Sequence, residues 1–168
     1  MDNLWSYSDK NMLSASTLLL RILAAGLCDK RGVIGASEYE IKLIEDQLNV
    51  RLPSDYRSFL EAVGKSAGRF WDDCDFQLEK LAALQERAAA ILDNWEEGKL
   101  VLPKQAFVFT MRQGEQFMFF ENVHANAPYT IYFYFEGRGC FEPVAECFWD
   151  AIDSELREFE SFIRSIRQ

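Results

Sequence analysis

The sequence predicts an α+β fold in which helices pack against one antiparallel sheet, and three observations predict it. Up to about residue 97, apolar side chains recur every three or four positions, as in amphipathic helices. Between residues 104 and 145 apolar residues alternate instead, with glycine-containing turns between the runs, as in a meander of strands. Helical spacing returns at Phe148 and continues to Ile166. Helices, then strands, then one helix is an order typical of an α+β domain.

The N-terminal part is expected to be mainly helical, with a loop from Asp29 to Gly35. Residues 1–34 form a helical extension, because leucine and isoleucine recur at spacings of three and four between residues 12 and 25. Residues 35–64 form a helix pair. Within it, Ser37 and Glu40 have the spacing of a capping box, which predicts where the first helix of the pair begins. A length of 168 residues favours a single domain over residues 1–168.

One proline shapes the turn inside this helix pair. Pro53 holds the residue before it in extended backbone. We expect Ser54 to cap the second helix, which then runs from Asp55 to Val63. Gly64 follows directly and is expected to end the helix in the left-handed conformation that glycine adopts without strain.

The second half should hold a long middle helix, an antiparallel sheet of about four strands or more, and a C-terminal helix. The middle helix is expected over residues 76–97, the sheet over residues 104–145 and the last helix over residues 148–166. Gln113-Gly114-Glu115 separates two runs of alternating phenylalanines, which indicates a hairpin. The expected strands contain Phe107–Phe109, Phe117–Phe119, Tyr129–Phe135 and Phe141–Val144.

The charge excludes one class of partner. The chain has 18 Lys and Arg against 27 Asp and Glu, a net charge of −9. This balance argues against direct binding of nucleic acid, since phosphate recognition uses clustered basic side chains. Residues 1–70 hold nine acids and nine bases, so the whole excess belongs to residues 71–168.

Two further features suggest a cytoplasmic protein without a metal site. The N-terminus lacks the basic and apolar regions of a secretory signal, and no apolar run approaches the length of a membrane span. The four cysteines stand far apart with no C-x-x-C pair, so we expect reduced thiols, mostly buried, and no zinc.

Catalysis has little support in the sequence, and we expect neither an enzyme nor a cofactor. His124 is the single imidazole and lies in a segment that resembles an exposed loop. No nucleophile motif and no phosphate-binding glycine loop accompanies it. A small enzyme would need a pocket with perturbed carboxylates near His124 or Tyr134.

Two segments allow a functional and a structural interpretation. In Trp71-Asp72-Asp73-Cys74-Asp75, an aromatic side chain beside three acids is typical of a binding hot spot. The same acids could instead favour the N-terminus of the helix expected near Phe76. The aromatic strands either form ordinary sheet core or provide the floor of a concave surface.

Several stretches together resemble the SUKH superfamily. They are Gly35-Ala36-Ser37-Glu38 with Ile41, Ile44 and Glu45; Leu52-Pro53-Ser54-Asp55-Tyr56-Arg57-Ser58-Phe59-Leu60; Leu102 to Phe109; Gln113 to Phe120; Tyr132 to Gly137; and Val144 to Phe148. The resemblance extends from Gly35 to Phe162. Cys147 departs from it at a common serine position, and Val63 departs where many members have asparagine.

The resemblance implies an α+β fold and a non-catalytic protein that binds other proteins. Bacterial members are immunity proteins that neutralise a toxin, and fungal relatives act as scaffolds in cell-wall assembly. We therefore expect a cognate toxin, such as a nuclease, as partner; the alternative is a regulatory or scaffold protein with an endogenous partner. The residues expected to contact the partner are Trp71, Asp72, Asp73, Asp75, Glu136 and Glu142.

Overall fold

The computed structural model describes residues 13–28, 32–94, 100–124 and 129–166. Two antiparallel sheets form in these residues: β1 pairs with β2, and a larger sheet has the strand order β3-β4-β5-β6-β7. The predicted α+β class and antiparallel sheet are confirmed. In chain order the elements are α1 (Ala15–Ala24), β1 (Val33–Ile34), α2 (Glu38–Leu48), α3 (Ser54–Val63), β2 (Ser66–Ala67), β3 (Cys74–Asp75), the 3-10 helix η1 (Leu78–Lys80), α4 (Leu81–Asp93), β4 (Phe107–Arg112), β5 (Gln116–Phe120), β6 (Ile131–Phe135), β7 (Phe141–Ala145) and α5 (Phe148–Ile166).

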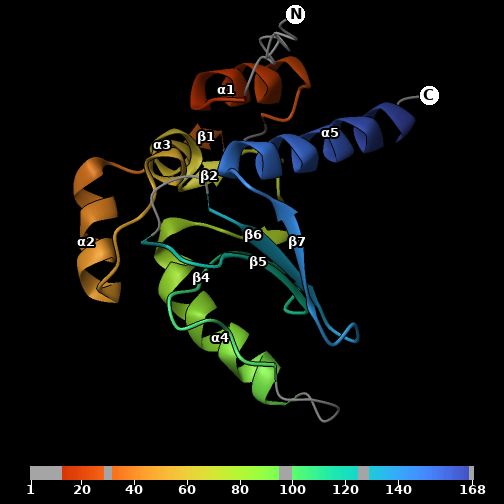
Figure 1. Ribbon diagram of the computed structural model, residues 1–168. Coiled ribbons are helices and arrows are strands. Elements are labelled where there is room, and N and C mark those ends of the chain that lie inside the picture. Colours follow the sequence, from red (N-terminus) through yellow and green to blue (C-terminus); the bar gives the residue numbers. More distant parts are fainter. Residues whose placement is uncertain (1–12, 29–31, 95–99, 125–128, 167–168) are drawn as a thin grey trace, which may run out of the picture.

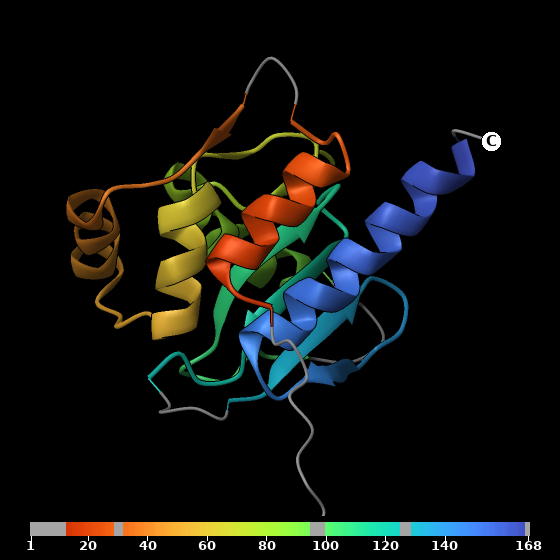
Figure 2. The ribbon, with the colours of Figure 1, turned by 90° about the horizontal axis from the view of Figure 1, so that it is seen from above.

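The five-stranded sheet is covered by helices on both faces. Helices α3 and α5 lie over one face, which we call the upper face, while α4 packs under β4 on the other (Figure 1). Helix α1 forms a further layer above α3 and α5, and seen from above it lies between them (Figure 2). In the described part of the chain, none of the helices is both long and apolar enough to cross a membrane.

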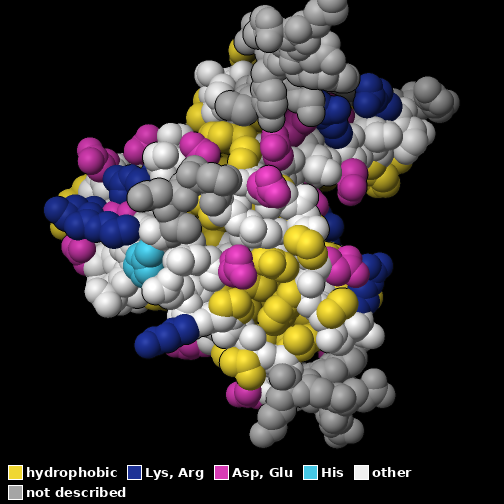
Figure 3. Space-filling view, in the orientation of Figure 1, with side chains coloured by type: hydrophobic (Ala, Val, Ile, Leu, Met, Phe, Trp, Pro, Cys, Tyr) yellow, Lys and Arg dark blue, Asp and Glu magenta, His cyan; other side chains and the backbone are white. Residues whose placement is uncertain are grey.

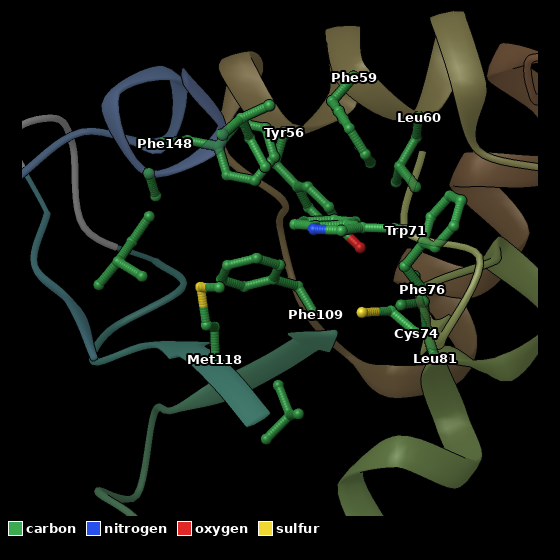
Figure 4. Packing of buried hydrophobic residues seen from close by; sticks show 14 of the residues in the cluster. Tyr56, Phe59, Leu60, Trp71, Cys74, Phe76, Leu81, Phe109, Met118 and Phe148 are labelled. Atoms are coloured by element: carbon green, nitrogen blue, oxygen red, sulfur yellow. The ribbon is translucent and has the colours of Figure 1, made fainter. Parts of the chain in front are cut away.

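An aromatic cluster joins α3 and α5 to the upper face of the sheet (Figure 4). Tyr56 is fully buried at its centre. Its ring lies 5.2 Å from that of Phe148 in α5 and 5.5 Å from that of Phe120 in β5, between ring centroids. Such pairs contribute roughly 0.5–1.5 kcal/mol each beyond the area they bury. The apolar faces of α3 and α5 thus fix both helices over β4 and β5.

Most of the aromatic strand residues are core. Phe117, Phe119 and Tyr134 are at most 1% exposed. Tyr132 and Phe141 are half-buried beside Phe119, at centroid distances of 5.6 and 4.9 Å. Figure 3 shows hydrophobic side chains gathered on the surface between α5 and α4. The core interpretation therefore holds for most of these side chains, and only β6 and β7 leave aromatic surface partly exposed among the described strands.

Two acidic side chains stabilise the helix pair of α2 and α3 by accepting hydrogen bonds from backbone N–H groups. The capping box between Ser37 and Glu40 is confirmed, and hydrogen bonds from Lys65 and Ser37 lower the pKa of Glu40 to about 2. Glu45 is buried, and its carboxylate accepts the Leu52 N–H at 2.9 Å and Arg57 Nη1 at 2.6 Å.

Two details of this pair differ from the prediction. Pro53, not Ser54, is the cap residue of α3; Ser54 is already helical, and no side-chain cap forms. Gly64 has φ −62°, so it is not left-handed. Asn49 adopts the left-handed conformation instead, at the end of α2. Gly35 is needed for space, because a Cβ atom there would lie 1.7 Å from the Glu61 carbonyl oxygen.

The hairpin of β4 and β5, the edge strand β7 and the C-terminal helix form where they were predicted. The third expected strand begins at Ile131 rather than Tyr129. The middle helix begins later than predicted. Phe76 is a buried residue before the 3-10 helix η1, and α4 begins at Leu81. Residues 95–97 of that predicted helix lie outside the described residues.

The cysteine prediction is partly wrong about burial. None of the four cysteines forms a disulfide bond. Cys74 is buried and Cys147 half-buried, but Cys28 and Cys140 are exposed.

Helix α1 is attached to α5 by one arginine. The Arg21 guanidinium donates to Glu160 through Nε and Nη2, at 2.9 Å each, and also to Asp153. Each of these three side chains is about one quarter exposed. The extension is thereby connected to the C-terminal helix by ion pairs, while it packs against α3.

Candidate partner-binding site

Trp71 lies in the core instead of being exposed in its loop. It is 2% exposed and stacks on Phe70 at a centroid distance of 5.0 Å. Its backbone has φ 56°, a conformation that bulky residues seldom adopt. Its indole Nε1 donates to Glu155 Oε2 of α5 at 3.0 Å. This burial corrects the expectation of an exposed aromatic anchor, and Trp71 is left out of the contact set proposed below.

The acids that follow Trp71 interact with arginine and lysine side chains. Asp75 accepts Lys80 Nζ at 2.5 Å and Arg87 Nη1 at 2.6 Å. Partial burial opposes its charge, but these two hydrogen bonds outweigh burial and lower its pKa. Asp73 pairs with Arg112, with 3.0 Å between Oδ2 and Nε. The interpretation that these acids favour a helix N-terminus at Phe76 is wrong, because Cys74–Asp75 is strand β3.

The strand register brings the two predicted groups of acids to the same end of the sheet. Cys74 is opposite Arg112, Arg112 opposite Gln116, and Gln116 opposite Phe135. Neighbouring strands are about 4.8 Å apart. Along this row of strand ends the acids therefore span roughly 15–20 Å. We call this the acidic end of the sheet; its members are Asp72, Asp73, Glu115, Glu136 and Glu142.

The members of the acidic end differ in their partners. The Glu136 N–H donates to the Glu115 carbonyl at 3.1 Å, so these two exposed acids are neighbours across two strands. Glu142 accepts Arg138 Nη1 at 2.5 Å in an exposed pair. The sequence analysis missed Glu115, because it lies in the hairpin turn; the register of β5 with β6 places it beside Glu136.

A cleft opens next to the acidic end, between α5 and the upper face of the sheet. It encloses about 220 Å³, including space open to solvent, and its enclosed part holds no more than one water-sized group. Burial raises the pKa of the Cys74 thiol in its wall to about 12, so the thiol is neutral. Its lining residues are Trp71, Cys74, Thr110, Arg112, Gln116, Phe117, Met118, Phe133 and Glu155.

The polar groups of this cleft centre on Arg112 and Glu155. Arg112 Nη2 donates to Glu155 Oε2 at 3.2 Å, the same oxygen that accepts the Trp71 indole. The Arg112 Nε–H faces Asp73 at ion-pair distance but makes no hydrogen bond. The hydroxyl of Thr110, a residue 3% exposed, also has no hydrogen-bond partner. Sequence analysis missed Thr110 and Glu155, since only the fold brings β4 under α5.

Neither side chain considered for catalysis lies in this cleft. His124 is exposed beyond β5, and its backbone N–H donates to Asn122 Oδ1 at 3.0 Å. The Tyr134 hydroxyl is buried without a partner, and burial together with the nearby Glu136 raises its pKa. Over the described ranges, His, Cys, Asp and Glu side chains form no group of three or more that could hold a metal ion.

Comparison with known proteins agrees with the residues quoted above. The family model SMI1 / KNR4 family (SUKH-1) matches residues 35–154, which include the helix pair, the whole five-stranded sheet and the first part of α5. None of the curated proteins matches the chain. The matched region is more than half of the 168 residues, and the chain belongs to the SMI1 / KNR4 (SUKH-1) family.

Proposed function

We propose that this protein is a non-catalytic immunity protein that binds a cognate bacterial toxin and blocks its active site. Family membership is the observation that carries the proposal, because bacterial SUKH proteins act in this way. The protein would act in the cytoplasm, where a toxin reaches its target. Of the acids expected to contact the partner, we keep Asp72, Asp73, Glu136 and Glu142, and we add Glu115. We leave out Asp75, because Lys80 and Arg87 already bind its carboxylate.

The geometry of the acidic end supports a basic partner. Glu115 and Glu136 are exposed at the ends of hydrogen-bonded strands, so their positions are set by the sheet rather than by a long loop. Charges of one sign that are gathered on one face speed the encounter with an oppositely charged protein. This increase in association rate becomes smaller as the salt concentration rises. A nuclease must carry a basic surface to bind phosphates. The acidity that disfavours binding to nucleic acid thus favours binding to a protein that itself binds nucleic acid.

The second candidate is a regulatory or scaffold protein with an endogenous partner. The family itself favours it, since fungal members assist cell-wall assembly. The two candidates differ in one observable. An immunity protein protects cells from a toxin encoded beside it, whereas a scaffold protein co-purifies with a housekeeping protein and gives no such protection.

Co-expression tests the proposal directly. The gene for the neighbouring toxin-like protein is expressed with and without this protein, and cell growth is measured together with complex formation in a pull-down. Survival with a stable complex is the expected result. Unimpeded killing with no complex contradicts the proposal.

Charge-neutral variants then test the acidic end. Glu115→Gln with Glu136→Gln is expected to slow association with the toxin by roughly 5-fold at low salt, with little change in dissociation. The matched control is Asp46→Asn with Glu61→Gln, which removes two exposed acids from α2 and α3. Equal association rates for both variants, measured by surface plasmon resonance, would show that the toxin docks elsewhere.

A further inference from the structure

The cleft under α5 contains a buried hydroxyl that nothing in the fold explains. Thr110 is 3% exposed, lines the cleft and has no partner for its Oγ1. Buried polar groups in proteins are nearly always hydrogen-bonded, because burial without a partner costs free energy. An unpartnered hydroxyl aimed into a cleft therefore points to a ligand group that bonds to it.

A bulge in β4 turns Thr110 toward the cleft. The register with β5 shifts between Val108 and Thr110. The Phe109 ring contacts Tyr56 on the upper face of the sheet, and regular alternation would send the next side chain to the opposite face. Because of the bulge, Thr110 lines the cleft on the upper face as well. Bulges often redirect a side chain in this way next to functional sites.

An unused carboxylate oxygen in the cleft favours a cation. The charged residues in the lining are Glu155 and Arg112, and the guanidinium of Arg112 is also paired with Asp73, which lies outside the lining. Glu155 accepts both of its hydrogen bonds through Oε2, and among the described residues Oε1 accepts none. A negatively charged ligand would be repelled by the Glu155 carboxylate, whereas a cation could bond to Glu155 Oε1 and to Thr110 Oγ1.

The size and the apolar walls of the cleft further restrict which cationic group could bind there. Its enclosed part holds one water-sized group, which matches a compact ammonium better than the larger planar guanidinium. Met118 and Phe133 contribute apolar lining, which suits the aliphatic stem of a lysine. We propose that the cleft receives the ammonium group of a lysine side chain of the partner protein, an inference that rests on the proposed function for the partner's basic surface.

The test uses the whole protein and a small probe, so it needs no toxin. The protein is titrated with Nα-acetyl-lysine amide, and the indole N–H resonance of Trp71 is followed by NMR because that N–H donates to Glu155. We expect a saturable shift with a dissociation constant on the order of a few mM, as for other ligands of this size. Nα-acetyl-norleucine amide, which has a similar stem and no charge, should cause no saturable shift.

Two variants separate the roles of the cleft residues. Thr110→Val keeps the shape of the side chain and should weaken lysine amide binding by roughly 10-fold, the expected effect of losing a hydrogen bond to a charged group. Glu155→Gln should abolish binding. The matched control is Glu158→Gln, an exposed acid in the same helix, which should bind like the unaltered protein.

Several results would overturn the proposal. An equal shift with the norleucine probe would show only an apolar cleft, and a shift with phosphate would show an anion site. Tighter binding of Nα-acetyl-arginine amide would replace lysine with arginine as the occupant. The absence of any shift at 50 mM probe, well above the expected constant on the order of a few mM, would refute a lysine pocket. None of these results bears on toxin neutralisation, which the co-expression experiment measures separately.

Discussion

Glu45 provides the sharpest test of how the helix pair is held together. Its side chain is 3% exposed, and its two carboxylate oxygens have separate partners. One accepts the backbone N–H of Leu52 at 2.9 Å, and the other accepts Arg57 Nη1 at 2.6 Å. The carboxylate thus joins α2 both to the turn before Pro53 and to α3. Glu45→Ala is expected to remove both connections at once.

The cost of this substitution follows from what each partner loses. The Leu52 N–H would be left buried without an acceptor, which costs about 1–3 kcal/mol. Arg57 is 24% exposed and can reach water, so the lost ion pair adds only about 1 kcal/mol. We therefore expect Glu45→Ala to lower the free energy of unfolding by about 3 kcal/mol. Glu45→Gln keeps an acceptor for Leu52 and should cost about half as much.

Urea unfolding followed by circular dichroism measures these differences. With a slope of about 2–3 kcal/mol per molar urea, a loss of about 3 kcal/mol lowers the midpoint by roughly 1–1.5 M. The control is Asp46→Ala, the exposed acid next in sequence, which should change stability by less than about 0.5 kcal/mol. If Glu45→Ala shifts the midpoint no further than the control, or its effect adds fully to that of Arg57→Ala, the reasoning is refuted.

Two other contacts make predictions of the same kind. Arg21→Met should cost about 1–2 kcal/mol by removing the ion pairs of α1 with α5, seen as faster hydrogen exchange in α1 while α3 stays protected. Arg21 and Arg157 lower the Asp153 pKa although partial burial opposes them. The hydrogen-exchange protection of α1 should therefore be complete above about pH 4 and should decrease as the pH falls through the lowered pKa of Asp153. Neutral or mildly alkaline pH should not reduce this protection. Gly35→Ala should cost at least about 2 kcal/mol by clashing with the Glu61 backbone, and a melting temperature equal to that of the unaltered protein would contradict this.

The parts of the fold that depend on local chemistry could be predicted from the sequence. The capping box of Ser37 and Glu40 forms as expected because both partners lie within one helical turn. Helix α5 has both predicted ends, Phe148 and Ile166, because its apolar residues form one continuous stripe. Ser54 was assigned a cap that it does not make, because Pro53 already provides the extended residue before the helix.

The parts that depend on contacts distant in sequence could not be predicted. Trp71 lies in a loop rich in acids and glycine, so its surroundings in the sequence suggest exposure. Its burial depends on Phe59 of α3 and on Glu155 of α5, 84 residues further along the chain. The cleft has the same origin, since the bulge that redirects Thr110 is visible only in the pairing of β4 with β5.

Whether an acidic side chain of residues 71–168 can attract a partner protein depends on where it lies in the fold. Asp75 has two cationic partners, and Asp153 and Glu160 share Arg21, so these carboxylates mainly hold the fold together. Glu115 and Glu136 are neighbours at the exposed end of the sheet. A partner closer than the screening length of about 8 Å responds to nearby charges more than to the net charge of −9. Salt dependence of binding should therefore follow the acids at this end of the sheet and change little when paired acids elsewhere are replaced.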